Sequence, residues 1–484
     1  MEPLTRRQAL ILAGAGTVSL VVGGAGVLSN TDFGRGSFAG QALKETPVMR
    51  SSNGALKVKL SAAEENILVA GRQATVLAYN ESLPGPTLIV RPGDHLAVSL
   101  TNRLNQVTNL HVHGLHVSPK GNGDNAFVSV DPGESFDYEY QLPPDHRPGV
   151  YWYHPHHHGT VAEQIFGGLY GAIIVEDAEP LPVGRERVLV VSDITLDSFG
   201  EIPATSAMDQ MFGREGDLML VNGQINPTLT LAPDERERWR IVNACVARYL
   251  KLRLDGQTLQ LLGIDSGRSV RPDAVTEVVL APGNRADLLV TGRAGTSALR
   301  SLPVDRGSAM GMMGSRPRSS SDSVDLMTVT VKGAPAVERG PVPPQPPQRD
   351  LRTETVAATR QLTFAMGMDG MAMRNGEMSF TIDGQPFDAA RIDSAVQVGS
   401  VEEWTLVNTS PMDHPIHLHV WRMQIVNEQG GSADDPVWRD VVNVPARSRV
   451  TVRIAFDDFP GKTVYHCHIL AHEDAGMMGV VEAT

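Results

Sequence analysis

The stretch LIVRPGDHLAVSLTN at residues 88–102 contains the pattern that decides the fold. It reads as a short apolar strand, a Pro-Gly turn, a second strand whose apolar residues alternate with polar ones, and a closing asparagine. The pattern returns as LTLAPDERERWRIVN at 229–243 and as VQVGSVEEWTLVN at 396–408, so the unit recurs about every 140 to 165 residues. The chain therefore contains three copies of one structural unit.

Each copy is followed by a second strand signal that begins after a proline and small residues. These signals cover residues 130–140, 280–290 and 444–455. Short strands separated by Gly and Pro turns, with few segments of helical periodicity, are typical of Greek-key sandwiches. We predict an all-β fold of three consecutive Greek-key β-sandwich domains, which agrees with a length of 484 residues at about 150 residues per domain.

Two breaks in the strand pattern set the expected domain boundaries. The first is EDAEPLP at residues 176–182, and the second is the stretch from 333 to 350, where PVPPQPP favours an extended polyproline conformation. We therefore expect domains at residues 50–180, 181–335 and 355–484, with a Pro-rich linker at 336–354.

The N-terminus contains TRRQAL at residues 5–10 and then an apolar run, rich in Gly and Ala, to about residue 28. This arrangement resembles a twin-arginine export signal. We expect residues 1–42 to direct the protein to the periplasm, the cell envelope or the extracellular space, with cleavage after Ala42. Retention of the run as a membrane anchor is the alternative, and without such retention we expect no stable membrane insertion.

Charge and cysteine content narrow the expected partners. The formal net charge of −13 would repel nucleic acid, which leaves small molecules or cations. Only Cys245 and Cys467 are available for a disulfide. Because Cys467 lies in a run of metal-binding residue types, we expect Cys245 to be a buried core thiol. The sequence leaves the oligomeric state open.

The fifteen histidines fall into two groups that are separated by more than half of the chain. The middle domain therefore supplies no imidazole, and one large histidine site would need the first and third domains together. The first group is His95, His111, His113, His116, His146, His154, His156, His157 and His158, and the second is His414, His417, His419, His466, His468 and His472.

Four His-x-His pairs and one cysteine indicate two metal sites. The pairs are His111/His113, His154/His156, His417/His419 and His466/His468. In a strand, residues two apart emerge on the same face roughly 6 to 7 Å apart, so each pair can bind neighbouring ions in one cluster. Cys467 must point to the opposite face, where His414, His472 and Met477 are available. A thiolate, two imidazoles and a weak thioether form the blue-copper ligand set.

The histidine motifs resemble those of the multicopper oxidases, a family that includes laccases, bacterial cuprous oxidases and bilirubin oxidases. The motifs are HVHG at 111–114, WYHPHHHG at 152–159, HPIHLH at 414–419 and HCHILAHEDAGMM at 466–478, and the resemblance runs from about residue 55 to the end. It implies cupredoxin-like domains and four copper ions: one type 1, one type 2 and a coupled type 3 pair. The implied ligands are His414, Cys467, His472 and axial Met477 for type 1, His111 and His417 for type 2, and His113, His154, His156, His419, His466 and His468 for type 3.

This resemblance implies an oxidase that couples four one-electron oxidations to the reduction of O2 to two water molecules. An axial Met477 stabilises cupric copper and favours easily oxidised donors, namely phenols, aromatic amines, Cu(I) and Fe(II). Met-rich stretches at 310–313 and 366–373 favour Cu(I), although methionines that fill gaps in the core are the alternative. A dedicated cuprous oxidase for copper tolerance is therefore a second interpretation.

Two other classes of protein fit the sequence less well. A copper nitrite reductase shares cupredoxin domains and a blue site, but it needs neither a third domain nor the His-Cys-His run at 466–468. Copper-free structural proteins of this fold lack most ligands, whereas here every ligand position is filled.

Residues beside the ligands complete the expected site. Asp124 and Glu473 resemble acids that similar enzymes place near the cluster, where they act as proton relays; holding a loop turn is the alternative role. Met412 and Asp413, immediately before His414, are expected at the type 1 rim where a donor would dock. Among the surplus histidines, we expect His157 and His158 to orient ligands or face solvent, and His95, His116 and His146 to be surface or packing residues.

Overall fold

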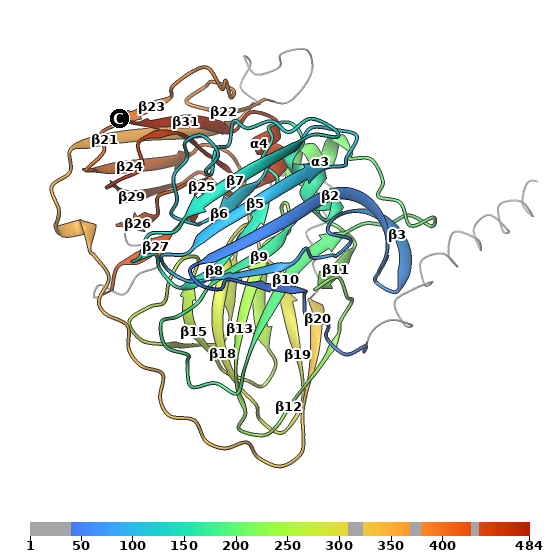
Figure 1. Cartoon of the computed structure of the whole chain (residues 1–484). Coiled ribbons are helices and arrows are strands. Elements are labelled where there is room, and N and C mark those ends of the chain that lie inside the picture. The colour runs from blue at the N-terminus through green and yellow to red at the C-terminus, as the bar shows by residue number, and fades with distance from the viewer. Residues whose placement is uncertain (1–39, 308–322, 368–378, 427–434) are drawn as a thin grey trace, which may run out of the picture.

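The computed structural model describes residues 40–307, 323–367, 379–426 and 435–484. Six sheets stack in pairs as three β-sandwiches, so the predicted all-β, three-sandwich fold is confirmed. In Figure 1 the second sandwich lies at the bottom of the view, with the first and third above it. The expected export signal lies largely outside the described residues. Ala42, the expected cleavage position, pairs with Thr228 of the second sandwich.

The first sandwich pairs a sheet of order β1-β4-β9-β8-β6 with one of order β3-β2-β5-β7. Alternating burial along β5 reflects the alternating apolar residues of its sequence. Its strands are β1 Val48–Arg50, β2 Ala55–Val69, β3 Arg72–Tyr79, β4 Thr87–Val90, β5 His95–Asn102, β6 His111–His113, β7 Ser135–Gln141, β8 Gly149–His154 and β9 Gly171–Val175.

The second sandwich pairs a sheet of order β11-β10-β13-β18-β15-β16 with one of order β12-β20-β19-β14-β17. Its strands are β10 Arg185–Ile194, β11 Leu218–Val221, β12 Thr228–Leu231, β13 Arg236–Asn243, β14 Leu250–Leu254, β15 Leu259–Ile264, β16 Asp273–Val275, β17 Val278–Leu280, β18 Arg285–Thr291, β19 Gly295–Leu302 and β20 Val324–Val331.

One strand of the second sandwich departs from its sequence pattern. The sequence of β13 alternates, yet the strand is buried on both faces from its second residue on. Arg238 is fully buried because Asp287 on β18 accepts two hydrogen bonds from its guanidinium, at 2.8 and 2.5 Å. Charged residues here belong to the interior.

The third sandwich pairs a sheet of order β22-β21-β24-β29-β26-β27 with one of order β23-β31-β30-β25-β28. Residues 332–350, which precede it, contain no helix or strand. Its strands are β21 Ala358–Met366, β22 Phe380–Ile382, β23 Ser394–Val396, β24 Ser400–Asn408, β25 His414–Leu418, β26 Met423–Ile425, β27 Val437–Arg439, β28 Val441–Val444, β29 Arg449–Phe456, β30 Gly461–Cys467 and β31 Met478–Ala483.

The closing asparagine of the repeated sequence has the same role in all three sandwiches. Each side-chain NH2 donates to the carbonyl of the residue that begins the following strand signal: Asn102 to Val130, Asn243 to Leu280 and Asn408 to Val444, at 2.8, 3.1 and 3.0 Å. Each side-chain oxygen accepts a main-chain N–H two residues further on. The repeat thus encodes the same corner in each of the three sandwiches.

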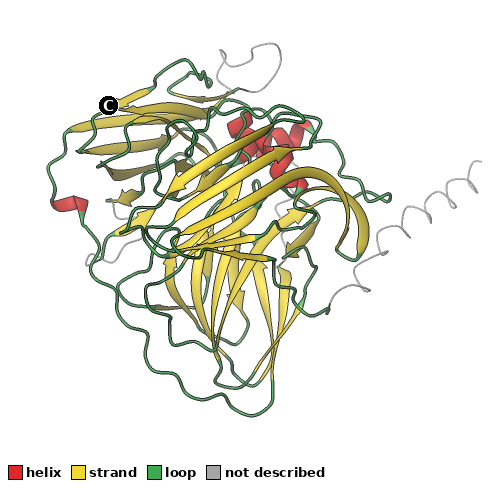
Figure 2. Ribbon diagram, in the orientation of Figure 1, coloured by secondary structure: helices red, strands yellow, loops and turns green. Residues whose placement is uncertain are grey.

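Short helices lie close together in the upper part of the view in Figure 2. They are α2 Val161–Gly167, α3 Ala207–Phe212 and α4 Leu470–Asp474, with a 3-10 turn, η1, at Leu351–Thr353. Asp474 of α4 accepts main-chain hydrogen bonds from Gly159 and Ala162 at the start of α2, both at 2.8 Å, and so ties the third sandwich to the first. Among the described residues, none of the helices has the length and apolarity needed to cross a membrane.

Candidate metal centre

The His-x-His pairs lie on neighbouring strands of two sandwiches. In the first sandwich, β6 pairs with β8 so that His111 is opposite His154. In the third, β25 pairs with β30 so that His417 is opposite His466 and Ile416 is opposite Cys467. The two sets of strands meet across the interface, where the ring of His111 stacks on that of His419 at 3.8 Å between centroids. Eight buried imidazoles therefore surround one volume.

The imidazole nitrogens face one another at separations typical of metal ligands. The distance from His417 Nε2 to His111 Nε2 is 3.4 Å, and that from His154 Nε2 to His113 Nδ1 is 3.4 Å. His466 Nε2 lies 3.1 Å from His156 Nε2 and 3.3 Å from His419 Nε2. Two nitrogens that each lie about 2 Å from one ion, at a tetrahedral angle, are about 3.3 Å apart. The arrangement fits several adjacent metal ions.

In several of these histidines, the ring nitrogen that points away from the cluster is held by a hydrogen bond. His111 Nδ1 lies 2.9 Å from Asp124 Oδ1, and His154 Nδ1 donates to the carbonyl of Pro155 at 2.8 Å. His466 Nδ1 lies 3.1 Å from the carbonyl of Cys467. Such bonds fix the tautomer of a ligand imidazole and leave the other nitrogen free to bind a metal.

His468 supplies the clearest sign that the cluster needs ligands. Both of its ring nitrogens are buried and have no hydrogen-bond partner among the described residues. An unpartnered buried polar atom is costly unless something binds it. Burial also lowers the pKa of His468 well below its usual value, and it lowers that of His156 and His466 to about 4, so the rings are neutral at pH 7. Neutral imidazoles are the form that binds copper.

A second centre lies on the opposite face of β30. Cys467 Sγ lies 3.4 Å from His414 Nδ1 and 3.8 Å from His472 Nδ1, while Met477 is fully buried and its carbonyl accepts the Cys467 N–H at 3.0 Å. The outer nitrogen of His414 is bonded to Ser410 Oγ at 2.9 Å. Burial raises the pKa of the Cys467 thiol, so its thiolate needs a bound cation. The donor set fits a blue-copper ion.

The outer edge of this second centre is covered. His472 is fully buried, because its Nε2 donates to the carbonyl of Met211 on α3 at 3.1 Å and Phe380 stacks on its ring at 4.2 Å between centroids. Access to His472 from solvent is therefore closed in the described structure.

Both predicted acids lie beside cluster histidines. Asp124 contacts His111, and its Oδ1 also accepts the Val112 N–H at 3.1 Å. Glu473 Oε2 lies 3.1 Å from His466 Nδ1, and Glu473 Oε1 lies 3.5 Å from His156 Nε2. Burial raises the pKa of both carboxyl groups to about 7. Each is therefore able to hold or release a proton near neutral pH.

The expected rim residues do not form an open rim in the described structure. Met412 is only 2% exposed and packs in the core of the third sandwich, and its main chain pairs with that of Gly307. Both carboxyl oxygens of Asp413 are occupied, by the Asn443 amide and the Ala446 N–H, each at 2.9 Å. The role of Met412 and Asp413 in docking a donor beside this centre stays a prediction.

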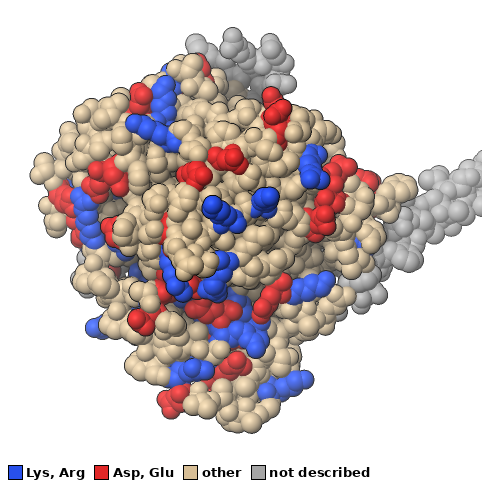
Figure 3. Space-filling model, in the orientation of Figure 1, with Lys and Arg blue, Asp and Glu red and all other residues tan. Residues whose placement is uncertain are grey.

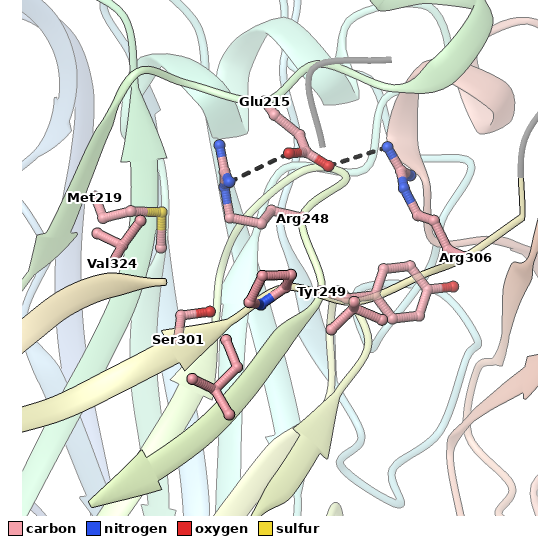
Figure 4. A pocket seen from close by; sticks show the side chains of 10 residues that line it. Glu215, Met219, Arg248, Tyr249, Ser301, Arg306 and Val324 are labelled. Carbon is pink, nitrogen blue, oxygen red and sulfur yellow. Dashed lines mark hydrogen bonds and ion pairs between the residues drawn. The ribbon is translucent and has the colours of Figure 1, made fainter. Parts of the chain in front are cut away.

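A small pocket is lined by residues of the second sandwich, two of which, Tyr249 and Arg306, also contact the third sandwich (Figure 4). Glu215 pairs with Arg248 at 3.2 Å and with Arg306 at 3.0 Å. Tyr249 donates to Asn443 Oδ1 at 2.7 Å.

Several residues of the site escaped prediction. Asp440 contacts His113 and His417, and it is held by Arg285 and Asp265 of the second sandwich. Asp440, Arg285 and Asp265 are single charged residues within apolar strands and loops, and no local sequence spacing marks them as part of the site. Among the surplus histidines, His146 is buried, and His116 bonds to Asp458 at 3.0 Å.

Comparisons with known proteins agree with this geometry. Family models described as multicopper oxidase match residues 61–180, 186–298 and 342–484. The multicopper oxidase mco of Staphylococcus haemolyticus is 27% identical over 85% of this chain and 84% of its own, and the cell division protein FtsP of Proteus mirabilis is 27% identical over 93% and 94%. The solved multicopper oxidase of Campylobacter jejuni, described as a metallo-oxidase, is 31% identical over 92% of this chain and 96% of its own, with a TM-score of 0.81.

Proposed function

The chain belongs to the multicopper oxidase family and is a laccase-like copper oxidoreductase, and we propose that it holds four copper ions and takes electrons from low-valent metal ions to reduce O2 to water. The observation that carries this proposal is the pair of buried ligand sets on the two faces of β30, which Cys467 and its neighbouring histidines connect.

We propose the following copper ligands, which the positions of the side chains support. The copper at Cys467 would be held by His414, Cys467, His472 and Met477, and a second copper by His111 and His417. The coupled pair would be held by His113, His154 and His468 on one ion and by His156, His419 and His466 on the other. Copper supplies one-electron oxidation and reduction at these positions.

The protein contributes connection and proton supply. Cys467 is covalently linked through the main chain to His466 and His468, so the two ligand sets are joined by one short peptide. Reduction of O2 to water consumes protons. Glu473 beside His466 and Asp124 beside His111 hold protons on their carboxyl oxygens and deliver them to the cluster.

Burial of the electron-entry edge favours metal ions over phenols as donors. The Met211 carbonyl and the Phe380 ring cover His472, which leaves no edge for a phenol ring to contact. On the same helix, Met208 is 50% exposed and offers a thioether, a ligand that prefers Cu(I). The Met-rich stretches lie almost wholly outside the described residues, but Gly307, which precedes one, contacts Met412, and Phe380, which follows the other, contacts His472.

Two alternatives have support of a different kind. Phenols and aromatic amines remain the second class of donor, because other relatives carry the name laccase. A copper-free structural role, suggested by the similarity to FtsP, conflicts with the retention of every predicted ligand and with the unpartnered nitrogens of His468.

The twin-arginine motif supports action outside the cytoplasm. On the face shown in Figure 3, acidic and basic side chains are interspersed, which is consistent with small partners rather than nucleic acid.

Oxygen uptake by the copper-loaded protein tests this proposal. We expect rapid uptake with Cu(I) and Fe(II) and slow uptake with a dimethoxyphenol, with and without added copper. Fast phenol oxidation without added copper, together with negligible oxidation of both metal ions, would reject metal ions as the donors. Absence of uptake with every donor would reject the oxidase itself.

A further inference from the structure

Arg285 of the second sandwich lies where all three sandwiches meet. Its guanidinium is fully buried and donates to each of them: Nε to the carbonyl of Val150 in the first sandwich at 3.0 Å, Nη1 to Asp265 in the second at 3.2 Å, and Nη1 and Nη2 to Asp440 in the third at 2.5 and 2.6 Å. Only the planar fork of an arginine can make this set of bonds, because lysine has a single nitrogen.

Asp440 connects Arg285 to two of the proposed ligands, because it contacts both of them. Its Oδ1 lies 3.2 Å from His113 Nε2, and its main-chain carbonyl accepts a hydrogen bond from His417 Nδ1 at 2.8 Å. The first contact leaves Nδ1 of His113 to face His154, and the second leaves Nε2 of His417 to face His111. Asp440 therefore selects the metal-binding nitrogen in one histidine from each histidine-bearing sandwich.

The second sandwich holds Asp440 from more than one side. Asp265 Oδ2 accepts the Asp440 N–H at 3.1 Å and the Val441 N–H at 3.3 Å, and Ser266 Oγ lies 3.4 Å from Asp440 Oδ2. The side chain and the main chain of Asp440 are thus fixed together.

Close packing of glycines leaves little room for this network to shift. A Cβ at Gly283 would lie 2.7 Å from the ring of His468, and a Cβ at Gly114 would lie 2.5 Å from Arg285 Nη2 and 2.8 Å from Asp440 Oδ2. Both backbones therefore approach the ligands and their supports more closely than any side chain would allow.

We infer that Arg285, together with Asp265, is a positioning residue through which the second sandwich sets the geometry of the histidine cluster, although this sandwich supplies no ligand. The inference rests on the proposed four-copper site. It predicts that loss of the guanidinium fork disturbs the cluster coppers and spares the copper at Cys467, whose ligands the network does not touch.

Arg285→Lys tests the inference, with Arg238→Lys as the matched control. Arg238 is also fully buried in the second sandwich and also makes a two-bond pair with an aspartate, Asp287, but it contacts no proposed ligand. In the copper-loaded Arg285→Lys protein we expect unchanged blue absorption, an altered electron paramagnetic resonance signal from the copper at His111 and His417, and a loss of turnover of about 10 to 100-fold. Arg238→Lys should retain the wild-type signal and turnover per bound copper.

Equal spectroscopic change in both variants, or wild-type cluster signals in Arg285→Lys, would overturn the inference. If Arg285→Lys does not fold, Asp265→Asn is measured by the same signals, and a wild-type cluster signal in that variant contradicts the inference too. The wild-type protein separates this result from the proposed function: a wild type that binds copper at both centres but takes up no O2 rejects the oxidase, while the comparison of cluster signals still decides the role of Arg285.

Discussion

The sulfur of Cys467 lies 3.4 Å from His414 Nδ1, on the face of β30 opposite to its neighbour His466. His466 meanwhile faces His156 of the first sandwich, with 3.1 Å between their Nε2 atoms. One short strand end thus belongs to two ligand sets, one formed within the third sandwich and one shared between two sandwiches. In the proposed function, this relationship gives electrons a route from a donor to O2.

Glu473→Gln should slow the reduction of O2. The amide cannot supply a proton to His466 and its surroundings, so turnover should fall by about 100-fold or more, the usual contribution of a positioned proton donor. Blue absorption should be unchanged, because the Glu473 carboxyl group contacts His466 and His156 of the cluster rather than the ligands of the copper at Cys467. Stopped-flow reoxidation of the reduced protein by O2 is the measurement. Wild-type reoxidation in the variant would show that Glu473 only holds its loop.

Met477→Leu should raise the reduction potential of the copper at Cys467. Removal of the thioether withdraws a weak ligand that stabilises cupric copper. The blue colour should remain, because Cys467, His414 and His472 are unchanged. Redox titration followed by blue absorption measures the shift. An unchanged or lower potential would mean that Met477 is not an axial ligand.

Asn243→Ala should destabilise the second sandwich. The substitution removes hydrogen bonds to the carbonyls of Arg248 and Leu280 and from the N–H of Cys245, and buried groups left unpaired cost about 1 to 3 kcal/mol each. Thermal unfolding of the copper-free protein should show a lower Tm than the wild type. Asn105→Ala, at an exposed position, is the control. Equal Tm values for the two variants would argue against the corner role of the repeated asparagine.

The copper-free protein should lose stability as the pH falls below about 6.5. Burial lowers the pKa of His146 from 6.5 to about 3, so its ring stays neutral in the folded chain but takes up a proton in the unfolded chain. The contribution of neutral His146 to the free energy of unfolding is complete above pH 6.5. It is lost as the pH falls toward 3, by up to about 1.4 kcal/mol per pH unit. The buried ligand histidines, such as His414, shift in the same direction.

Thermal unfolding between pH 7 and pH 5 measures this effect. His146→Gln should be less stable at pH 7, where its ring bonds are missing, but its Tm should fall less steeply with decreasing pH. A slope as steep as that of the wild type would show that His146 does not contribute to the pH dependence.

Much of the fold was predictable because its signals are local. The alternation of residues 95–102 and the closing asparagines of the three repeats appear directly as β5 and as the matching corners. The spacing of His466, Cys467 and His468 is also local, since it requires only that a strand alternates its side chains. Such features do not depend on what lies across the interface.

Other features depend on contacts between distant segments. The sequence of β13 resembles a half-exposed strand, yet Arg238 is buried because Asp287, 49 residues away, neutralises it. The burial of Met412 could not be predicted, because it involves distant segments such as Gly307, which pairs with it from more than a hundred residues earlier in the chain. Asp440 gives no sign of its role, because His113 and Arg285 both approach it from other sandwiches.

The stoichiometry of Fe(II) oxidation against O2 consumption tests the central claim most directly. Both quantities are measured in one closed vessel with the copper-loaded protein, together with an assay for hydrogen peroxide. Two connected copper centres that complete the reduction to water should consume four Fe(II) ions for each O2 and release no peroxide. Consumption of two Fe(II) ions for each O2, with peroxide accumulating in step, would contradict a joined four-copper site.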